Sequence, residues 1–175
     1  TKTIRRFASL HSYNLQQKTA IMIEQFRETT RHKINGRAKA MVVTSSRLHA
    51  VRYYHEFKTY IEKKGYDDLN ILIAFSGVVS DGGVNYTEEG MNKRADGTTI
   101  GEKQLPAEFN SDDFNILMVA EKYQTGFDEP LLHTMFVDKK LSGVKAVQTL
   151  SRLNRTTSGK EDTFILDFVN TKEEI

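Results

Sequence analysis

Five short apolar runs, separated by longer segments, limit what this chain can fold into. They read KAMVVT (39–44), ILIAF (71–75), NILMVA (115–120), TMFV (134–137) and TFILDFV (163–169). Runs of this length and composition predict strands that are buried in a sheet. Because helical patterns separate several of them, the sequence predicts an α/β fold with a mostly parallel sheet flanked by helices.

Two amphipathic helices are expected between these runs. Residues 15–32 have helical periodicity, and the Asn35-Gly36 pair is their stop signal. A second helix is expected over residues 48–64, with Ser45 or Ser46 as its N-cap and Gly65 at its C-terminal end. The side chains expected to face the core are Leu15, Met22, Ile23 and Phe26 in the first helix and Leu48, Val51, Tyr54, Phe57 and Ile61 in the second.

The domain organisation expected from the sequence is simple. A chain of 175 residues has the size of one domain. Residues 1–36 are expected to be an N-terminal helical segment that links to an upstream lobe, and residues 37–175 the main domain. Residues 76–104 hold six of the 11 glycines and few aliphatic side chains, so we expect a loop there. Its role stays open.

Composition excludes several classes of protein. No apolar stretch approaches 18 residues, so no membrane span is expected. The absence of cysteine excludes disulfides, thiolate catalysis and zinc ribbons, and it fits a reducing cytoplasm. The five histidines lack ligand spacing, so no metal site is expected.

Charge is divided unevenly along the chain. Residues 1–64 hold 14 Lys and Arg against 4 Asp and Glu, a net charge of +10, whereas residues 65–175 hold 11 against 19, a net charge of −8. Such a split predicts either a basic surface that binds an anion or nucleic acid, or solvated helix faces.

The stretch QTLSRLNR (148–155) combines an apolar pattern with three polar side chains that can bind phosphate. On a continuous helix, at about 100° per residue, Gln148, Arg152 and Arg155 lie in one stripe. The residues expected on the opposite, buried face are Ala146, Val147, Leu150 and Leu153. From this stretch alone, surface ion pairs and a phosphate clamp are equally good interpretations.

Three polar clusters follow apolar runs. They are Thr44-Ser45-Ser46-Arg47, Thr125-Gly126-Phe127-Asp128 and the arginine stripe. Since ligands of open parallel sheets gather at the C-terminal ends of the strands, we expect all three clusters on that rim. Taken singly, the first is also explained as a helix N-cap and the second as a tight turn.

The order and spacing of the clusters indicate a protein family more specifically than any single cluster does. A Thr-Gly-x-Asp turn about 20 residues before Gln-x3-Arg-x2-Arg resembles motifs V and VI of superfamily-two helicases and translocases, and the Ser-Arg after the first run resembles motif IV. VTSSRLHAVRYY, TGFDEPLLHTMFVDKKLSG and AVQTLSRLNRT are similar to the second RecA-like lobe of the restriction (R) subunit of type I restriction-modification enzymes. The resemblance runs over residues 39–168.

The resemblance implies roles at a nucleotide. In such motors ATP and Mg²⁺ lie between two RecA-like lobes, and the first lobe holds them with its phosphate loop and Asp-Glu pair. The second lobe supplies arginines that stabilise charge on the γ-phosphate. By this resemblance Arg155 is the arginine finger, Arg152 its companion and Gln148 a nucleotide sensor, while Gly126 and Asp128 line the nucleotide.

The resemblance also implies contacts with DNA phosphates. The residues expected to make them are Ser46, Arg47, Thr125, Lys139 and Lys140. One position departs from the family pattern. Many superfamily-two helicases have a phosphate-binding threonine eight residues before the motif V aspartate, where this chain has Ala120.

The sequence lacks a G-x4-G-K-[ST] loop, an Asp-Glu-x-His box and a credible nuclease motif, so the chain alone is not expected to hydrolyse ATP. The resemblance implies the second motor lobe of an ATP-dependent, DNA-translocating type I restriction endonuclease in a prokaryotic cytoplasm. Its expected partners are double-stranded DNA, the first lobe and nuclease domain of the same subunit, and the methyltransferase and specificity subunits.

Two alternatives compete with this hypothesis. A non-catalytic DNA-binding or protein-docking module on a helicase-like scaffold stays open. A flavodoxin-like receiver would have an acidic cluster after the first apolar run, where this chain has Thr-Ser-Ser-Arg.

Overall fold

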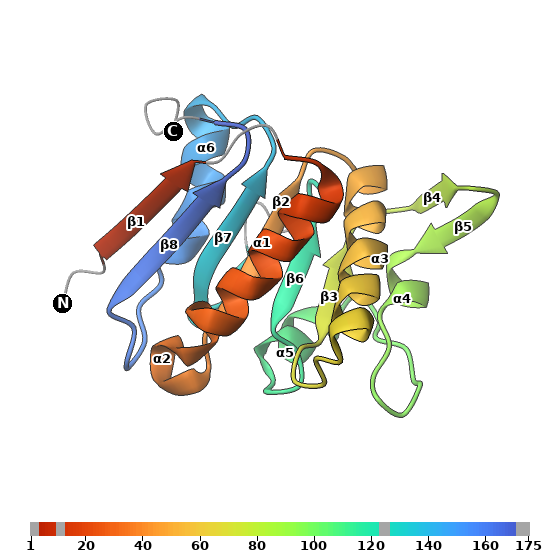
Figure 1. Ribbon diagram of the computed structural model, residues 1–175, viewed down its shortest axis with the longest axis horizontal. Coiled ribbons are helices and arrows are strands. Elements are labelled where there is room, and N and C mark those ends of the chain that lie inside the picture. The colour runs from red at the N-terminus through yellow and green to blue at the C-terminus, as the bar shows by residue number, and fades with distance from the viewer. Residues whose placement is uncertain (1–3, 10–12, 123–126, 171–175) are drawn as a thin grey trace.

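A single parallel sheet organises the molecule. The computed structural model describes residues 4–9, 13–122 and 127–170, and within these ranges six strands pair in the order β1-β8-β7-β2-β6-β3 (Figure 1). The strands are β1 (Ile4–Ser9), β2 (Lys39–Thr44), β3 (Ile71–Ala74), β6 (Ile116–Val119), β7 (Leu132–Asp138) and β8 (Asp162–Asp167). All neighbouring pairs in this sheet are parallel, which confirms the predicted fold class.

Helices cover both faces of the sheet. The front layer in Figure 1 holds α1 (Leu15–Glu28) and α3 (Arg47–Lys64), and the rear layer holds α5 (Leu105–Asn110), α6 (Gly143–Leu150) and the 3₁₀ turn η2 (Ser151–Asn154). Successive side chains of a strand point to opposite faces. In β2, Ala40 and Val42 therefore pack under α1 and α3, whereas Met41 and Val43 pack under α5 and α6. This two-sided burial explains why the strand sequences are continuously apolar.

The first helix ends earlier than expected. It stops at Glu28, and the chain continues through η1 (Thr30–His32) and α2 (Lys33–Gly36), where Ile34 and Asn35 both have positive φ. The predicted inward face is confirmed, since Met22, Ile23 and Phe26 are at most 1% exposed.

The second helix begins and ends at the predicted signals. The Ser46 side chain accepts a hydrogen bond from the His49 backbone N–H, 3.1 Å away, and caps α3. Gly65 closes α3 with φ of 69°, a left-handed conformation that favours glycine.

The N-terminal residues join the same structure. The strand β1 pairs with β8 at one edge of the sheet, and α1 packs on the front core. The division expected after residue 36 stays a prediction; the described residues before it supply a strand to the sheet and a helix to its cover.

Residues 76–104 are structured, so the expectation of an irregular loop is wrong. They form a hairpin of β4 (Val78–Asp81) and β5 (Val84–Thr87), followed by α4 (Glu88–Met91), beyond the β3 edge (Figure 1). The buried Asn92 side chain accepts from the Ile73 N–H (2.9 Å) and donates to the Ile73 carbonyl oxygen (2.8 Å). Glu88 accepts from the Phe75 N–H (3.0 Å). These side-chain bonds hold a segment that has little periodic pattern of its own.

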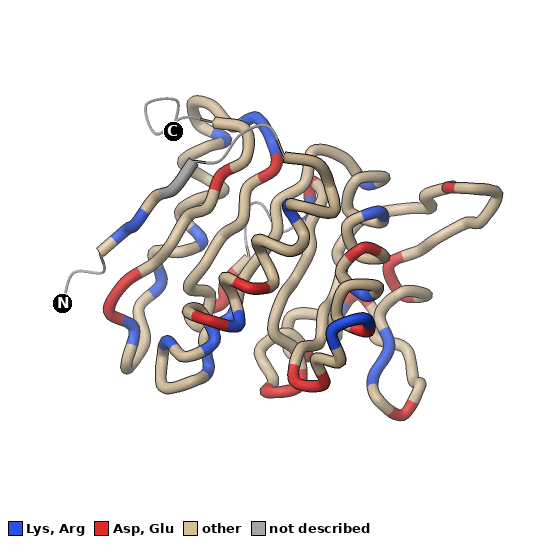
Figure 2. The backbone as a smooth tube through the Cα atoms, in the orientation of Figure 1, with Lys and Arg blue, Asp and Glu red and all other residues tan. Residues whose placement is uncertain are grey.

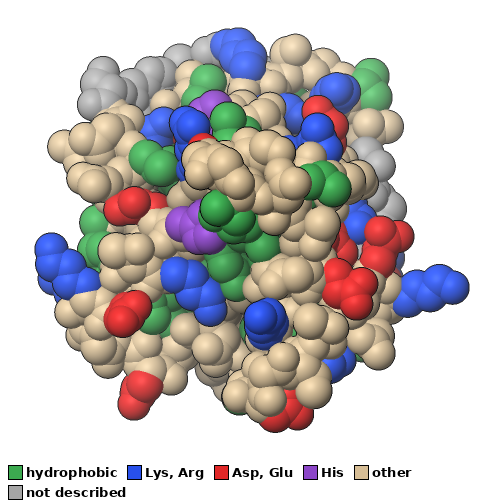
Figure 3. Space-filling model, turned by 90° about the vertical axis from the view of Figure 1, so that its right-hand side faces the viewer, with side chains coloured by type: hydrophobic (Ala, Val, Ile, Leu, Met, Phe, Trp, Pro, Cys, Tyr) green, Lys and Arg blue, Asp and Glu red, His purple; other side chains and the backbone are tan. Residues whose placement is uncertain are grey.

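The hairpin end of the molecule is mixed in charge. Figure 3 views this end and shows basic and acidic side chains interspersed around a centre of histidine and hydrophobic side chains. His55 of α3 stacks edge-on against Tyr86 of β5 with ring centroids 4.9 Å apart, and Arg52 of α3 pairs with Asp81 of β4. The hairpin is therefore attached to α3 as well as to β3.

Several ion pairs join the basic first part of the chain to the acidic remainder. They are Lys18–Asp138, Arg27–Asp68, Arg31–Asp68, Lys33–Asp162 and Arg52–Asp81. Figure 2 shows basic and acidic positions next to each other in several parts of the backbone. The uneven charge along the sequence thus contributes to contacts within the fold.

Asp138, at the end of β7, binds both front helices. One carboxylate oxygen accepts from Lys18 Nζ of α1 at 2.9 Å, and the other accepts from the Tyr53 hydroxyl of α3. The Lys18 and Asp138 side chains are only 18% and 11% exposed, so water screens this pair weakly.

We expect Asp138→Asn to lower the free energy of unfolding by about 2 kcal/mol, because charge-assisted hydrogen bonds to both helices weaken. Urea unfolding of the variant and the wild type measures this change. The control, Asp81→Asn, breaks the exposed Arg52 pair and should change stability by less than about 1 kcal/mol. Equal losses in the two variants would contradict a special role for Asp138.

Candidate functional site

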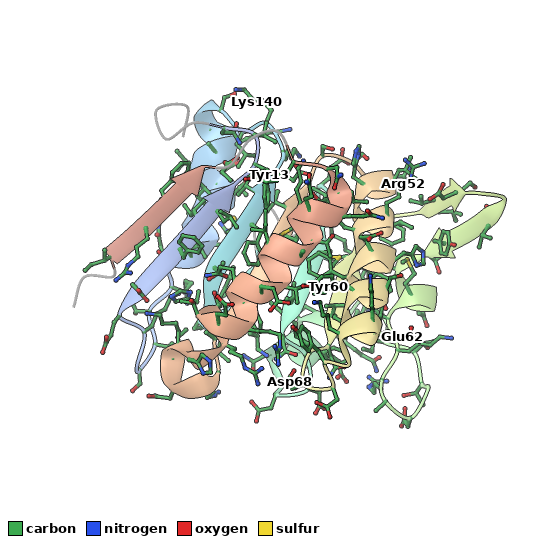
Figure 4. The ribbon with its side chains drawn as sticks, in the orientation of Figure 1. Tyr13, Arg52, Tyr60, Glu62, Asp68 and Lys140 are labelled. Atoms are coloured by element: carbon green, nitrogen blue, oxygen red, sulfur yellow. The ribbon has the colours of Figure 1, made fainter. Side chains whose placement is uncertain are left out.

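Two of the expected DNA-contact segments begin side by side. Thr44 of β2 and Asp138 of β7 are register partners at the ends of adjacent strands. Residues 45–47 and 139–140 follow them directly. Figure 4 labels Lys140 near the C-terminal ends of the strands and Asp68 at the opposite end of the molecule. This part of the predicted rim is therefore present, and we call it the strand-end rim.

Ser46 and Arg47 each have a structural partner at the strand-end rim. The Ser46 hydroxyl caps α3 and also lies 2.8 Å from His49 Nδ1. The exposed Arg47 donates from Nη1 to the carbonyl oxygen of Ser76, 2.8 Å away, just beyond β3. The capping interpretation of Ser46 is confirmed, while contact of either residue with DNA stays a prediction.

The loop that carries Lys139 and Lys140 is fixed by Asn170. The buried Asn170 side chain accepts from the Leu141 N–H at 3.0 Å and donates to the Lys139 carbonyl oxygen at 2.8 Å. Burial, followed by the nearby Lys145 cation, lowers the pKa of Lys139. Lys140 is exposed. The rim thus presents positive charge from a loop of defined conformation.

The stretch QTLSRLNR is not one continuous helix. The α-helix ends at Leu150, residues 151–154 form the 3₁₀ turn η2, and Arg155 has extended backbone (φ −68°, ψ 137°). The prediction of one narrow stripe is therefore wrong, because the helical periodicity stops after Leu150. On the expected buried face Val147 is 68% exposed. Burial is confirmed for Ala146, Leu150 and Leu153.

The two arginines do not share the strand-end rim, so that expectation is wrong as well. The connection after β7 must carry the chain back to the start of β8, and α6 does so along the rear face (Figure 1). Arg5, near the start of β1, donates from Nη2 to the Asn154 side-chain oxygen, 2.6 Å away. The turn that carries Arg155 therefore lies towards the starts of β1 and β8.

Residues from two of the sequence clusters meet at this turn. Arg155 Nε lies 3.0 Å from Asp128 Oδ1, with the two side chains 60% and 57% exposed. Arg152 is half-buried and donates from Nη1 to the Phe127 carbonyl oxygen at 2.9 Å. Gln148 is exposed, and its backbone oxygen accepts from Arg152 Nε at 3.3 Å. We call Asp128, Gln148, Arg152 and Arg155 the arginine site.

Two expected site residues, Thr125 and Gly126, lie outside the described residues. Sequence reasoning missed two others. Arg5 and Lys160 both contact the turn that carries Arg155. Neither had a sequence signal, because Arg5 lies in a strand with little apolar character and Lys160 in a polar Ser-Gly-Lys-Glu stretch.

Within the described residues, the structure offers neither a metal site of His, Asp and Glu side chains nor a membrane-spanning helix. Over residues 4–9, 13–122 and 127–170, no three His, Asp or Glu side chains come together in a way that could hold a metal ion. In the same ranges, none of the helices is long and apolar enough to cross a membrane.

Comparison with known proteins identifies relatives. A family model described as domain 3 of the type I restriction enzyme subunit R matches residues 85–170. A putative type I restriction enzyme endonuclease subunit (MjaVIIP) of Methanocaldococcus jannaschii is 29% identical over 177 residues, covering 91% of this chain and 15% of that protein. The HindI type I restriction endonuclease subunit of Haemophilus influenzae is 31% identical over 147 residues, covering 79% and 13%.

The fold is also found in a solved helicase. The E. coli DEAD-box protein SrmB, in its complex with regulator of ribonuclease activity A, matches with a TM-score of 0.57 and 15% identity over 97% of this chain and 79% of that chain. This chain is therefore a relative of type I restriction enzyme R subunits with a RecA-like helicase fold, as its motifs predicted. It spans 12% to 15% of the length of four curated relatives that it matches, the MjaVIIP and HindI subunits among them.

The two arginines should differ in their effect on stability. Arg155→Ala removes an exposed ion pair and should change the free energy of unfolding by less than about 1 kcal/mol. Arg152→Ala removes a half-buried group that holds the Phe127 carbonyl, and should lower it by about 2 kcal/mol. Urea unfolding distinguishes the two, and a larger loss for Arg155→Ala would show that Arg155 has a structural role instead.

Proposed function

We propose that this relative of type I restriction R subunits is the second RecA-like lobe of an ATP-dependent DNA translocase, in which Arg155 acts as an arginine finger. The observation that carries the proposal is the combination of a fixed turn and an exposed guanidinium. Arg155 lies at the end of a turn that Arg5, Arg152 and Lys160 hold by hydrogen bonds, while its own side chain is 60% exposed.

The arginine site fits a phosphate group. An exposed ion pair contributes little in water, so a phosphate that arrives at Arg155 can replace Asp128 with small loss. Arginine suits this role because its planar fork stays charged and can bind two phosphate oxygens. Because the chain lacks a phosphate loop, ATP and Mg²⁺ are held mainly by the first lobe in this proposal.

Each residue of the arginine site has a distinct task in this proposal. A guanidinium beside a transferring γ-phosphoryl group stabilises the negative charge that develops there. Arg155 supplies this guanidinium in the proposal. Arg152 positions the segment that carries Asp128, since it binds the neighbouring Phe127 carbonyl. The exposed Gln148 amide and Asp128 line the nucleotide.

DNA binds elsewhere on the lobe in this proposal. Arg47, Lys139 and Lys140 lie on the strand-end rim, away from the turn that carries Arg155, and their charges suit the phosphates of duplex DNA. Such contacts position DNA without reading its sequence. Sequence recognition and cleavage then fall to the specificity subunit and the nuclease domain, with the methyltransferase subunit as a further partner.

In the full-length subunit that contains this chain, we expect Arg155→Ala to lower DNA-stimulated ATP hydrolysis by roughly 10³-fold, as the loss of an arginine finger does. A steady-state phosphate-release assay measures this. Arg31→Ala is the control, because Arg31 forms an exposed pair with Asp68 outside the arginine site. Wild-type turnover in Arg155→Ala would rule out the finger assignment.

The DNA contacts are tested separately by salt dependence. Duplex binding by the subunit should fall steeply between about 50 and 200 mM salt, since each phosphate contact releases counterions. Arg47→Ala and Lys140→Ala should each reduce the slope of log K against log salt by about 1. An unchanged slope in both variants would favour a docking role for the strand-end rim.

A further inference from the structure

Lys160 lies beneath the turn that carries Arg155. Its sequence context is typical of an exposed loop, yet Lys160 is only 7% exposed. Nζ donates to the carbonyl oxygens of Pro130 at 3.2 Å, Leu153 at 2.9 Å and Arg155 at 2.6 Å. An ammonium group has three N–H donors, so these three acceptors satisfy it fully.

The three carbonyls belong to different segments around the arginine site. Pro130 lies in the segment from Asp128 to β7, Leu153 lies in η2, and Arg155 is the proposed finger itself. Burial lowers the pKa of Lys160 to about 8, while the nearby Glu129 carboxylate favours the charged form. The ammonium form therefore predominates at pH 7, and its hydrogen bonds are charge-assisted.

A glycine allows Lys160 to reach this position. Gly159 has φ of 86°, and a Cβ built there would lie 2.6 Å from Nδ2 of Asn35. A residue with a Cβ would be strained at this positive φ, and the Asn35 side chain would have to move to make room for it. Gly159 therefore lets the chain turn directly before Lys160 without that strain.

The Arg155 side chain is 60% exposed, and its ion pair with Asp128 is exposed too, so these contacts fix its position only weakly. The position of the Arg155 backbone therefore decides where the side chain can reach, and Lys160 binds that backbone at the carbonyl oxygen. We infer that Lys160 is a positioning residue, whose buried ammonium sets the place of Arg155 relative to the Asp128 segment. This inference rests on the proposed function of Arg155.

The chain offers a matched control in Lys39. Lys39 is 4% exposed, and its Nζ donates to the carbonyl oxygens of Ser111, at 2.6 Å, and Phe114. Burial also lowers the pKa of Lys39 to about 8. Lys39→Met and Lys160→Met therefore remove equivalent buried cations, but only Lys160 touches the turn of Arg155.

The experiment compares these variants in the full-length subunit. Lys160→Met should lower kcat of DNA-stimulated ATP hydrolysis by about 10- to 100-fold with little change in KM, because misplacing a catalytic group acts on turnover. In an Arg155→Ala background Lys160→Met should cause no further loss, since the two residues act as one unit. Lys39→Met should leave kcat near the wild-type value.

A second readout does not depend on activity. Hydrogen exchange, measured by mass spectrometry without nucleotide, should become faster at residues 151–156 in Lys160→Met. In Lys39→Met the faster exchange should lie at residues 111–116 instead. If Lys160→Met does not fold, Lys160→Gln replaces it with the same expected pattern and a smaller effect.

The outcomes separate this inference from the proposed function. Loss of turnover in Arg155→Ala together with normal turnover in Lys160→Met would overturn the role of Lys160 alone. An equal further loss in the Arg155→Ala background, or unchanged exchange at residues 151–156, would overturn it as well. Normal turnover in Arg155→Ala would overturn the proposed function, and the role of Lys160 with it.

Discussion

The parallel direction of all described strands in the main sheet decides where the polar residues of this domain lie. Each connection must return the chain from the end of one strand to the start of the next. Residues directly after β2 and β7 remain at the strand ends, which is where Arg47 and Lys140 lie. Arg155 comes after the return along α6 and therefore lies towards the opposite end. The cations proposed to contact DNA and the arginine proposed to contact a nucleotide therefore lie towards opposite ends of the strands.

Electrostatic pairing links parts of the chain that are distant in sequence. The basic first part supplies Lys18 and Lys33, and the acidic remainder supplies Asp138 and Asp162. The Lys18–Asp138 pair joins the first long helix to the centre of the sheet, where the same carboxylate also binds Tyr53. Charge asymmetry along this sequence is therefore partly a feature of folding, and it cannot be taken as a measure of nucleic-acid binding.

Sequence reasoning succeeded where burial imposes a pattern and failed where single side chains hold the backbone. Continuous apolar runs predicted five of the six strands of the main sheet in the described residues, and Ser46 and Gly65 predicted the ends of α3. The strand β1 was missed because it lies at the sheet edge, where Arg5 and Arg6 can face solvent. The break after Leu150 was missed because the apolar spacing continues through the 3₁₀ turn to the buried Leu153. No periodicity could have indicated that the polar loop before β8 places a buried ammonium under the arginine site.

Asn92 protects an open edge of the sheet from pairing with strands of other molecules. An open strand edge is a template on which another chain can add a strand, which is a common route to aggregation. At the outer edge of β3, the Asn92 side chain occupies both backbone groups of Ile73, and Glu88 occupies the N–H of Phe75. A single amide and a single carboxylate thus take the place of a covering strand. The residues that supply them, at the start of α4 and directly after it, keep this edge of the sheet from pairing with a strand of another molecule.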